Sequence, residues 1–212
     1  AEGTVVITDN QTAGRGQRGN TWESEPGLNL TFSVILKPVF LHPKDQFMLN
    51  MAVSLGLYDY LTVQTAGVKI KWPNDMMLGN KKTCGILIEN QVNGRQIQSS
   101  VAGIGLNVNQ KRFSLSTPTS LTLATGRAFV LNDVLTELLQ WMEARYLQLR
   151  AGIDLRMEYI AALYGRGEKR KFKTGDEIFE GVISGVDAVG LLEVEVNSGK
   201  RYFELKQVQF LS

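Results

Sequence analysis

The chain has 212 residues, of which 43% are hydrophobic and 21% are charged. This composition excludes a disordered chain, a collagen-like repeat and a coiled coil, and the length allows one sizeable core with a small second domain. The formal net charge of +2 is too small to indicate nucleic-acid binding, so an electropositive site must come from local clustering of basic residues.

The single cysteine and the single histidine restrict the chemistry further. Cys84 excludes an internal disulfide and most zinc ligand sets, which is typical of proteins in a reducing cytoplasm. His42 excludes any mechanism that needs two imidazoles. No apolar run approaches the roughly 20 residues that span a bilayer, and no signal-peptide pattern opens the chain. We therefore expect a cytoplasmic protein without a membrane segment.

In chain order, the first half alternates predicted strands with a long loop and a helix. Residues 4–8 are predicted to form a short buried strand, and a polar, glycine-rich loop follows over residues 9–27. Apolar side chains between Pro43 and Val63 recur every three or four residues, which predicts a helix. Residues 73–83 are predicted to be a loop. The other predicted strands are glycine-punctuated or rich in β-branched and aromatic residues: 28–36, 68–72, 84–89 and 100–108.

The second half changes from helices to short strands. Asn132 or Asp133 is suited to cap a helix that ends at Gly152, and a shorter helix is predicted over residues 155–163. After Gly165, five short alternating runs separated by turn residues predict a small barrel. We therefore expect an α/β (α+β) fold with two domains. Residues 1–165 form a mixed β-sheet with helices on one face, and residues 166–212 form a small C-terminal β-barrel.

Glycines and arginines are concentrated in residues 14–22, GRGQRGNTW. The backbone N–H groups of the glycines can converge on an anion without hindrance from side chains, and Arg15 and Arg18 add two cations. The stretch lacks the Lys-Ser/Thr ending of a Walker loop and leads into no helical pattern, so neither a P-loop nor a dinucleotide fold is predicted. Taken alone, the stretch fits an anion-binding loop and a solvated hairpin equally well.

Two further stretches place polar groups beside predicted strands. Residues 71–75, KWPND, end in Asn74 and Asp75 at a strand terminus, where α/β folds hold ligands. Lys82 follows Asp75 by seven residues. A plain Asn-Asp turn with a surface lysine is the alternative interpretation. Residues 103–109, GIGLNVN, fit either a strand with close backbone packing or an approach to a ligand.

In this order and spacing, the three stretches resemble the motifs of the biotin protein ligase family, which joins biotin to a carrier-protein lysine through a biotinyl-adenylate. The match runs from about Thr8 to Asn109 and continues more loosely through residues 119–121 and the C-terminal barrel. The resemblance implies an ATP-dependent ligase, in the form without the DNA-binding domain, whose catalytic domain is residues 1–165. The alternatives are a lipoate–protein ligase, which shares the catalytic fold, and a non-catalytic module that binds nucleic acid or protein.

The resemblance also implies roles for single residues. Attack of a carboxylate on the α-phosphate of ATP brings anions together, and each such contact at ~4 Å costs about 4 kcal/mol at an effective dielectric near ~20, so cations must offset it. The implied catalytic residues are Lys82, Arg15 and Asp75. The implied biotin-binding residues are Gln11, Gly14, Arg15, Gly16, Gln17, Lys82 and Gly85. The implied ATP-binding residues are Arg18, Trp22, Lys71, Asn74 and Asn107, and Asn107 would also reach the magnesium ion of magnesium-ATP.

The implied partner is a biotin carboxyl carrier protein, whereas DNA binding is not expected and a homodimer is left open.

Two parts of the sequence depart from the family pattern. Gln17 stands where many members carry a second arginine, and residues 1–10 do not match the Ser-Thr-Asn segment that lines the biotin pocket upstream of the glycine loop. The basic run over residues 166–173 is interpreted as a solvated edge of the barrel, because Phe172 alone supplies an aromatic side chain there.

Overall fold

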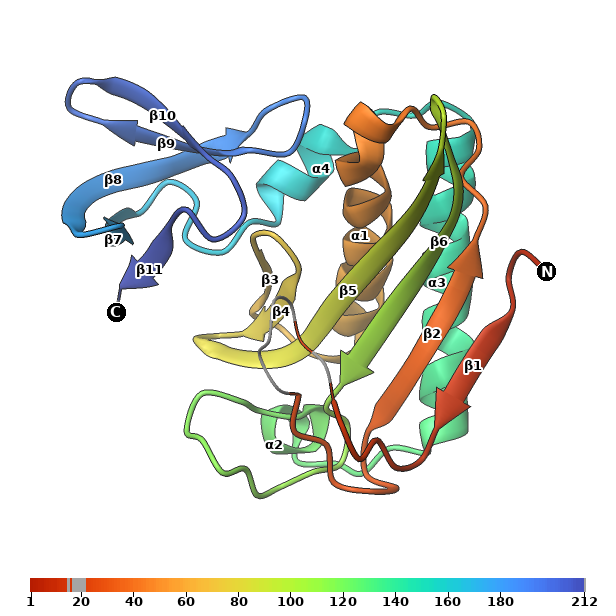
Figure 1. Cartoon of the computed structure of the whole chain (residues 1–212). Coiled ribbons are helices and arrows are strands. Elements are labelled where there is room, and N and C mark those ends of the chain that lie inside the picture. Colours follow the sequence, from red (N-terminus) through yellow and green to blue (C-terminus); the bar gives the residue numbers. More distant parts are fainter. Residues whose placement is uncertain (15, 17–21, 212) are drawn as a thin grey trace.

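The computed structural model describes residues 1–14, 16 and 22–211, and the strands of this part of the chain form two sheets (Figure 1). The strands of the first sheet are β1 (Val5–Thr8), β2 (Leu30–Leu36), β3 (Val68–Lys71), β4 (Asp75–Leu78), β5 (Lys81–Asn93) and β6 (Gln96–Leu106). They lie in the order β1-β2-β6-β5-β4-β3, and every neighbouring pair is antiparallel. The predicted fold class is confirmed. The sheet is antiparallel rather than mixed, because β3, β4, β5 and β6 follow one another through short turns, which reverse the chain direction.

The second sheet forms the small C-terminal unit, at the upper left of Figure 1. Its strands are β7 (Lys169–Thr174), β8 (Glu177–Val186), β9 (Leu192–Val196), β10 (Gly199–Phe203) and β11 (Gln209–Leu211). The order β10-β9-β8-β7-β11 makes a five-stranded antiparallel sheet over the residues of the predicted small β-barrel, in agreement with a small C-terminal β domain. Phe172 is buried, and its ring centroid lies 5.5 Å from that of Phe179 and 5.4 Å from that of Phe210, so aromatic side chains make up part of its core.

Two long helices cover one face of the first sheet, α1 and α3 (Figure 1). The helical elements are the short 3₁₀ helix η2 (Pro43–Asp45), α1 (Gln46–Gln64), α2 (Leu121–Thr125), α3 (Leu131–Arg150) and α4 (Arg156–Ala161). Helices α1 and α3 approach closely at Gly56, where a Cβ atom would lie 2.7 Å from Cα of Met142. Within the described residues, none of these helices combines the length and the hydropathy needed to cross a membrane.

The predicted long helices are confirmed, but three predicted details are wrong. The predicted buried strand over residues 4–8 is the edge strand β1 (Val5–Thr8), whose Val6 is 59% exposed, because an edge strand has a partner on one side alone. The predicted loop over residues 73–83 contains β4 and the start of β5, since Met76 and Met77 are buried in the sheet. The N-cap of α3 is Val130, which makes no side-chain cap bond, in place of Asn132 or Asp133.

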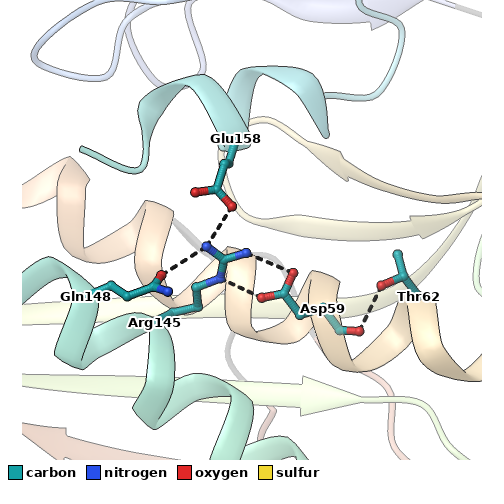
Figure 2. Close-up of polar contacts among 5 residues, drawn as sticks. All are labelled: Asp59, Thr62, Arg145, Gln148 and Glu158. Carbon is teal, nitrogen blue, oxygen red and sulfur yellow. Dashed lines mark hydrogen bonds and ion pairs between the residues drawn. The ribbon is translucent and has the colours of Figure 1, made fainter. Parts of the chain in front are cut away.

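An ion network joins α1, α3 and α4 through one guanidinium (Figure 2). Arg145 on α3 donates from Nε to Oδ2 of Asp59 at 2.6 Å and from Nη2 to Oδ1 at 3.1 Å, and its Nη1 donates to Oε2 of Glu158 at 2.7 Å. The side chains of Arg145 and Asp59 are 14% and 16% exposed. The hydrogen bond to Asp59 is the main reason why the pKa of Arg145 lies above its ordinary value.

We expect the Arg145→Leu substitution to lower the free energy of unfolding by about 3 kcal/mol, because it leaves the largely buried carboxylate of Asp59 without a counter-charge. Urea unfolding of the two proteins measures this difference. Arg156→Leu is the matched control, since its ion pair with Asp154 is exposed and 3.8 Å long, and its loss is expected to cost less than about 1 kcal/mol. Equal losses in the two variants would contradict the assignment.

Candidate functional site

A cavity of about 280 Å³ opens on the face of the first sheet opposite the helices. Strands β2, β5 and β6 supply its floor. Successive side chains of a strand point to opposite faces, so Thr31 and Ser33 of β2 face the cavity while Leu30 and Leu36 are buried in the core. Three glycines lie in register beside them and leave space above the strands because they have no side chains: Gly85, Gly103 and Gly105.

The indole of Trp22 lies directly on this floor. A Cβ atom on Gly105 would lie 2.5 Å from Cε2 of Trp22, and one on Gly85 would lie 3.4 Å from Cζ3. Glycine at these positions therefore allows the ring to lie against the strands. The backbone N–H of Trp22 donates to the carbonyl of Gly14 at 3.1 Å, which closes the base of the glycine loop. The indole Nε1 is buried against Gly105 and has no hydrogen-bond partner among the described residues.

Lys82 and Asp75 form an ion pair at the wall of the cavity. The Nζ–Oδ1 distance is 2.6 Å, and the two side chains are 35% and 25% exposed. The ammonium also lies 5.5 Å from the centroid of the Trp22 ring. Since a Cβ atom on Gly85 would lie 3.2 Å from Nζ, Gly85 makes room for the ammonium at the cavity surface. The pair is thus a partly exposed cation with a fixed carboxylate beside it.

The backbone of Lys82 is held on both sides by the segment that precedes α2. Its N–H donates to the carbonyl of Thr117 at 3.0 Å, and its carbonyl accepts from the N–H of Thr119 at 2.8 Å. Asn107 supports this segment, because its Nδ2 donates to the carbonyl of Thr119 at 3.0 Å. Asn107 is only 2% exposed and lines neither of the two cavities near Lys82 in the described part of the chain. Its predicted contact with ATP and magnesium therefore stays a prediction, and the observed contact is structural.

A second cavity, of about 410 Å³, lies between the two sheets. The first sheet supplies Lys71 and the turn that follows it, and the second sheet supplies Gln209 and Phe210. The Nζ atom of Lys71 lies 5.2 Å from the centroid of the Phe210 ring. The two cavities adjoin, because both are lined by Gly16, Trp22, Asn74 and Lys82.

The structure brings most of the described candidate residues together. Gln11, Gly16 and Gly85 line the first cavity, and Lys71 lines the second. The amide of Asn74 donates to the carbonyl of Ile86, so this side chain holds the turn beside its strand. Arg15, Gln17 and Arg18 lie outside the described residues, and their roles stay predictions.

The sequence analysis missed the cavity residues that lie outside the three motif stretches, such as Thr31, Ser33 and Phe210. The alternation of β2 could have identified Thr31 and Ser33, since it determines which face each side chain occupies. Phe210 gave no such signal, because its place beside Lys71 depends on how the two sheets pack.

Cys84, His42 and the basic run over residues 166–173 have structural roles. Cys84 is fully buried, and burial raises the pKa of its thiol, which disfavours the reactive thiolate. Nδ1 of His42 accepts from the N–H of Lys44 at 3.2 Å and caps η2. In the basic run, Lys169 pairs with Glu180 at 2.7 Å, as expected for a solvated edge.

Known proteins resemble this chain in both sequence and structure. The model of the biotin/lipoate A/B protein ligase family matches residues 1–107. The bifunctional ligase/repressor BirA of Bacillus subtilis is 34% identical over 93% of this chain, and the chain spans 63% of that relative's length. A biotin--[acetyl-CoA-carboxylase] ligase of Mycobacterium tuberculosis is 29% identical over 92% of this chain and 74% of its own.

A solved structure agrees on the fold. A biotin protein ligase from Aquifex aeolicus, in complex with biotin and ATP, superposes with a TM-score of 0.83 at 24% identity. The match covers all of this chain and 90% of that one. Since the family model spans half of the chain and the remainder has the same fold, this chain belongs to the biotin/lipoate A/B protein ligase family.

Proposed function

We propose that the chain is an enzyme that joins biotin to a lysine of a biotin carboxyl carrier domain through a biotinyl-adenylate. The observation that carries this proposal is the position of Lys82, whose side chain lines both adjoining cavities. One ammonium can then contact a carboxylate in the first cavity and a phosphate in the second. The names of the relatives from Bacillus subtilis and Mycobacterium tuberculosis support the same activity.

In the first step, biotin would occupy the cavity on the sheet, with its carboxylate at Lys82 and its ring system toward Gln11. Thr31 and Ser33 offer hydroxyl groups to the polar part of the ring, and the indole of Trp22 lies on the floor of the same cavity. A carboxylate oxygen attacks the α-phosphorus of ATP, and the bond from that phosphorus to the departing pyrophosphate breaks. The ammonium of Lys82 offsets the repulsion between the two anions, about 4 kcal/mol for each contact at ~4 Å.

In the second step, the ε-amine of the acceptor lysine attacks the acyl carbon of the adenylate, and AMP leaves. The amine must lose a proton in this step. Asp75 lines the second cavity, and its carboxylate holds the ammonium of Lys82 at 2.6 Å. We therefore assign Asp75 two roles, to position Lys82 and to receive the proton of the acceptor amine.

Magnesium enters this scheme as the ion that accompanies ATP. Among the described residues, no three His, Cys, Asp or Glu side chains come together as ligands. The carboxylate of Asp75 is occupied by Lys82, and Oδ1 of Asn107 supplies a single neutral oxygen without a partner. Magnesium in nucleotide enzymes is held largely by substrate phosphates and water. The phosphates would therefore be its main ligands.

Lipoate is the second candidate substrate, because the matched family includes lipoate ligases. In the test, the protein is incubated with ATP, magnesium, a purified carrier domain and either biotin or lipoate. The mass of the carrier domain is then measured by mass spectrometry. We expect the mass of one biotinyl group to be added with biotin and no change with lipoate. Addition of a lipoyl group, or no addition with either acid, would overturn the proposal.

We further propose a biotin carboxyl carrier protein as the physiological partner and the cytoplasm as the compartment. The relative from Mycobacterium tuberculosis is named for acetyl-CoA carboxylase, which supports a carboxylase carrier domain as the acceptor. The single cysteine, buried at position 84, fits a reducing compartment.

A further inference from the structure

We propose that the turn between β8 and β9, residues 187–191, is a positioning element for the Asp75–Lys82 pair. The turn belongs to the second sheet, and it acts through Trp72, which lies between β3 and β4. The inference rests on the proposed function, because it concerns the two residues assigned to the reaction. It gives the C-terminal sheet a defined part in the geometry of the site.

The link is a buried hydrogen bond. Nε1 of Trp72 donates to the carbonyl of Gly190 at 3.0 Å, across 118 positions of sequence. Trp72 is buried, so this N–H has no access to water as an alternative partner. The same short turn carries Trp72 at its start and leads into Asp75 at the first position of β4. A shift of the indole therefore moves the backbone that carries the carboxylate of the ion pair.

The turn around Gly190 is well suited to hold that carbonyl in place. Oδ1 of Asp187 accepts from the backbone N–H groups of Val189 at 2.9 Å and Leu191 at 2.8 Å, which fixes the turn internally. Gly190 has a φ of +94°, and a Cβ atom there would overlap the ring of Phe47 on α1. Glycine is therefore required both for the backbone conformation and for the contact with α1.

Further contacts of the turn over residues 72–75 come from α1, α4 and β5. The carbonyl of Pro73 accepts from Nδ2 of Asn50 at 2.7 Å and from the hydroxyl of Tyr159 at 3.0 Å. The carbonyl of Asn74 accepts from the N–H of Ile86 at 3.0 Å. The middle and the end of the turn are thus held by α1, α4 and β5, while its start is held by the second sheet. Lys71 and Asp75, which flank the turn, pair between β3 and β4, so removal of the Gly190 contact loosens the indole at the start of a turn whose other end carries Asp75.

The experiment perturbs this bond from its two sides. Trp72→Phe removes the donor and keeps an aromatic ring, whereas Gly190→Ala keeps the carbonyl and displaces the turn from Phe47. The controls are Trp141→Phe, an exposed indole on α3, and Gly175→Ala, a glycine of the same sheet with a φ of +56° and open space around its Cβ position. The two readouts are the steady-state kinetics of biotin-dependent pyrophosphate release and the amide hydrogen exchange of residues 74–78.

In Trp72→Phe and in Gly190→Ala we expect kcat to fall about tenfold with the KM for biotin changed by less than about twofold, because the loss concerns alignment in the reaction and not biotin binding. Exchange in residues 74–78 should be faster in both variants, and both controls should match the unmodified protein. Unchanged kcat in the two variants would overturn the inference. So would a fall in kcat without faster exchange in residues 74–78. Exchange that becomes faster throughout the chain, the pattern of general destabilisation, would also overturn it.

The exchange readout does not depend on the activity. If the unmodified protein releases no pyrophosphate, the proposed function fails, and the positioning of the turn is then decided by exchange alone. Faster exchange at residues 74–78 in both variants would support the link in that case, and unchanged exchange would overturn it.

Discussion

Replacement of Lys82 by alanine is expected to lower the rate of biotin-dependent pyrophosphate release by about 10²–10³-fold. Lys82 is a cation that lines both cavities in the described part of the chain. Its removal would leave the carboxylate of biotin and the α-phosphate of ATP facing each other without its positive charge between them. The side chain is 35% exposed and its main partner is Asp75, so the core does not depend on it. A coupled pyrophosphate assay measures the rate, and circular dichroism verifies the fold.

Lys81→Ala is the matched control for this substitution. Lys81 precedes Lys82 in β5 and its side chain is exposed, so its charge lies on the opposite side of the strand from the ion pair. We expect a rate close to that of the unmodified protein. A near-normal rate in Lys82→Ala would remove Lys82 from the mechanism, and an equal loss in both variants would indicate a general effect of positive charge.

Gly105→Ala is expected to weaken biotin binding by about 10–100-fold. A methyl group at this position would lie 2.5 Å from Cε2 of Trp22, and since β6 is held by β2 and β5 on its two sides, the indole must move. Overpacking of this kind costs about 1–3 kcal/mol, which corresponds to the expected range of affinity. Isothermal titration with biotin measures the loss.

Gly103→Ala separates displacement of Trp22 from simple filling of the cavity. Gly103 lies on the same strand and the same floor, but a methyl group there would meet the carbonyl oxygen of Leu87 at 3.5 Å, an ordinary contact. The indole N–H resonance of Trp22 should shift in Gly105→Ala and stay in place in Gly103→Ala. Identical spectra for the two variants would contradict the proposed contact between Trp22 and Gly105.

Local patterns in the sequence were enough to predict the elements that carry the site. The spacing of apolar residues predicted α1 and α3, and the polar residues after β3 marked the turn that ends in Asp75. The pairing of Asp75 with Lys82 follows from a hairpin, because β4 and β5 run antiparallel and place Lys82 opposite Met77, two positions from Asp75 along β4. Contacts between neighbouring elements of this kind can be predicted from the order of residues.

Contacts between elements that are distant in sequence could not be predicted from local patterns. The bond between Trp72 and Gly190 and the placement of Phe210 beside Lys71 depend on how the two sheets pack. The burial of Asn107 was missed for a related reason, since its partner Thr119 lies in an irregular segment that only the folded chain brings under Lys82. Exposure of β1 was missed because a run of β-branched residues does not reveal whether a strand lies at the edge of its sheet.

The most direct test of the two-cavity arrangement is exchange of labelled pyrophosphate into ATP, which reports the reversible activation of an acid at the α-phosphate. With biotin present, the unmodified protein is expected to incorporate the label into ATP, and Lys82→Ala is expected to incorporate almost none. Incorporation that needs no biotin, or none at all from a folded protein with biotin and magnesium-ATP, would contradict the account.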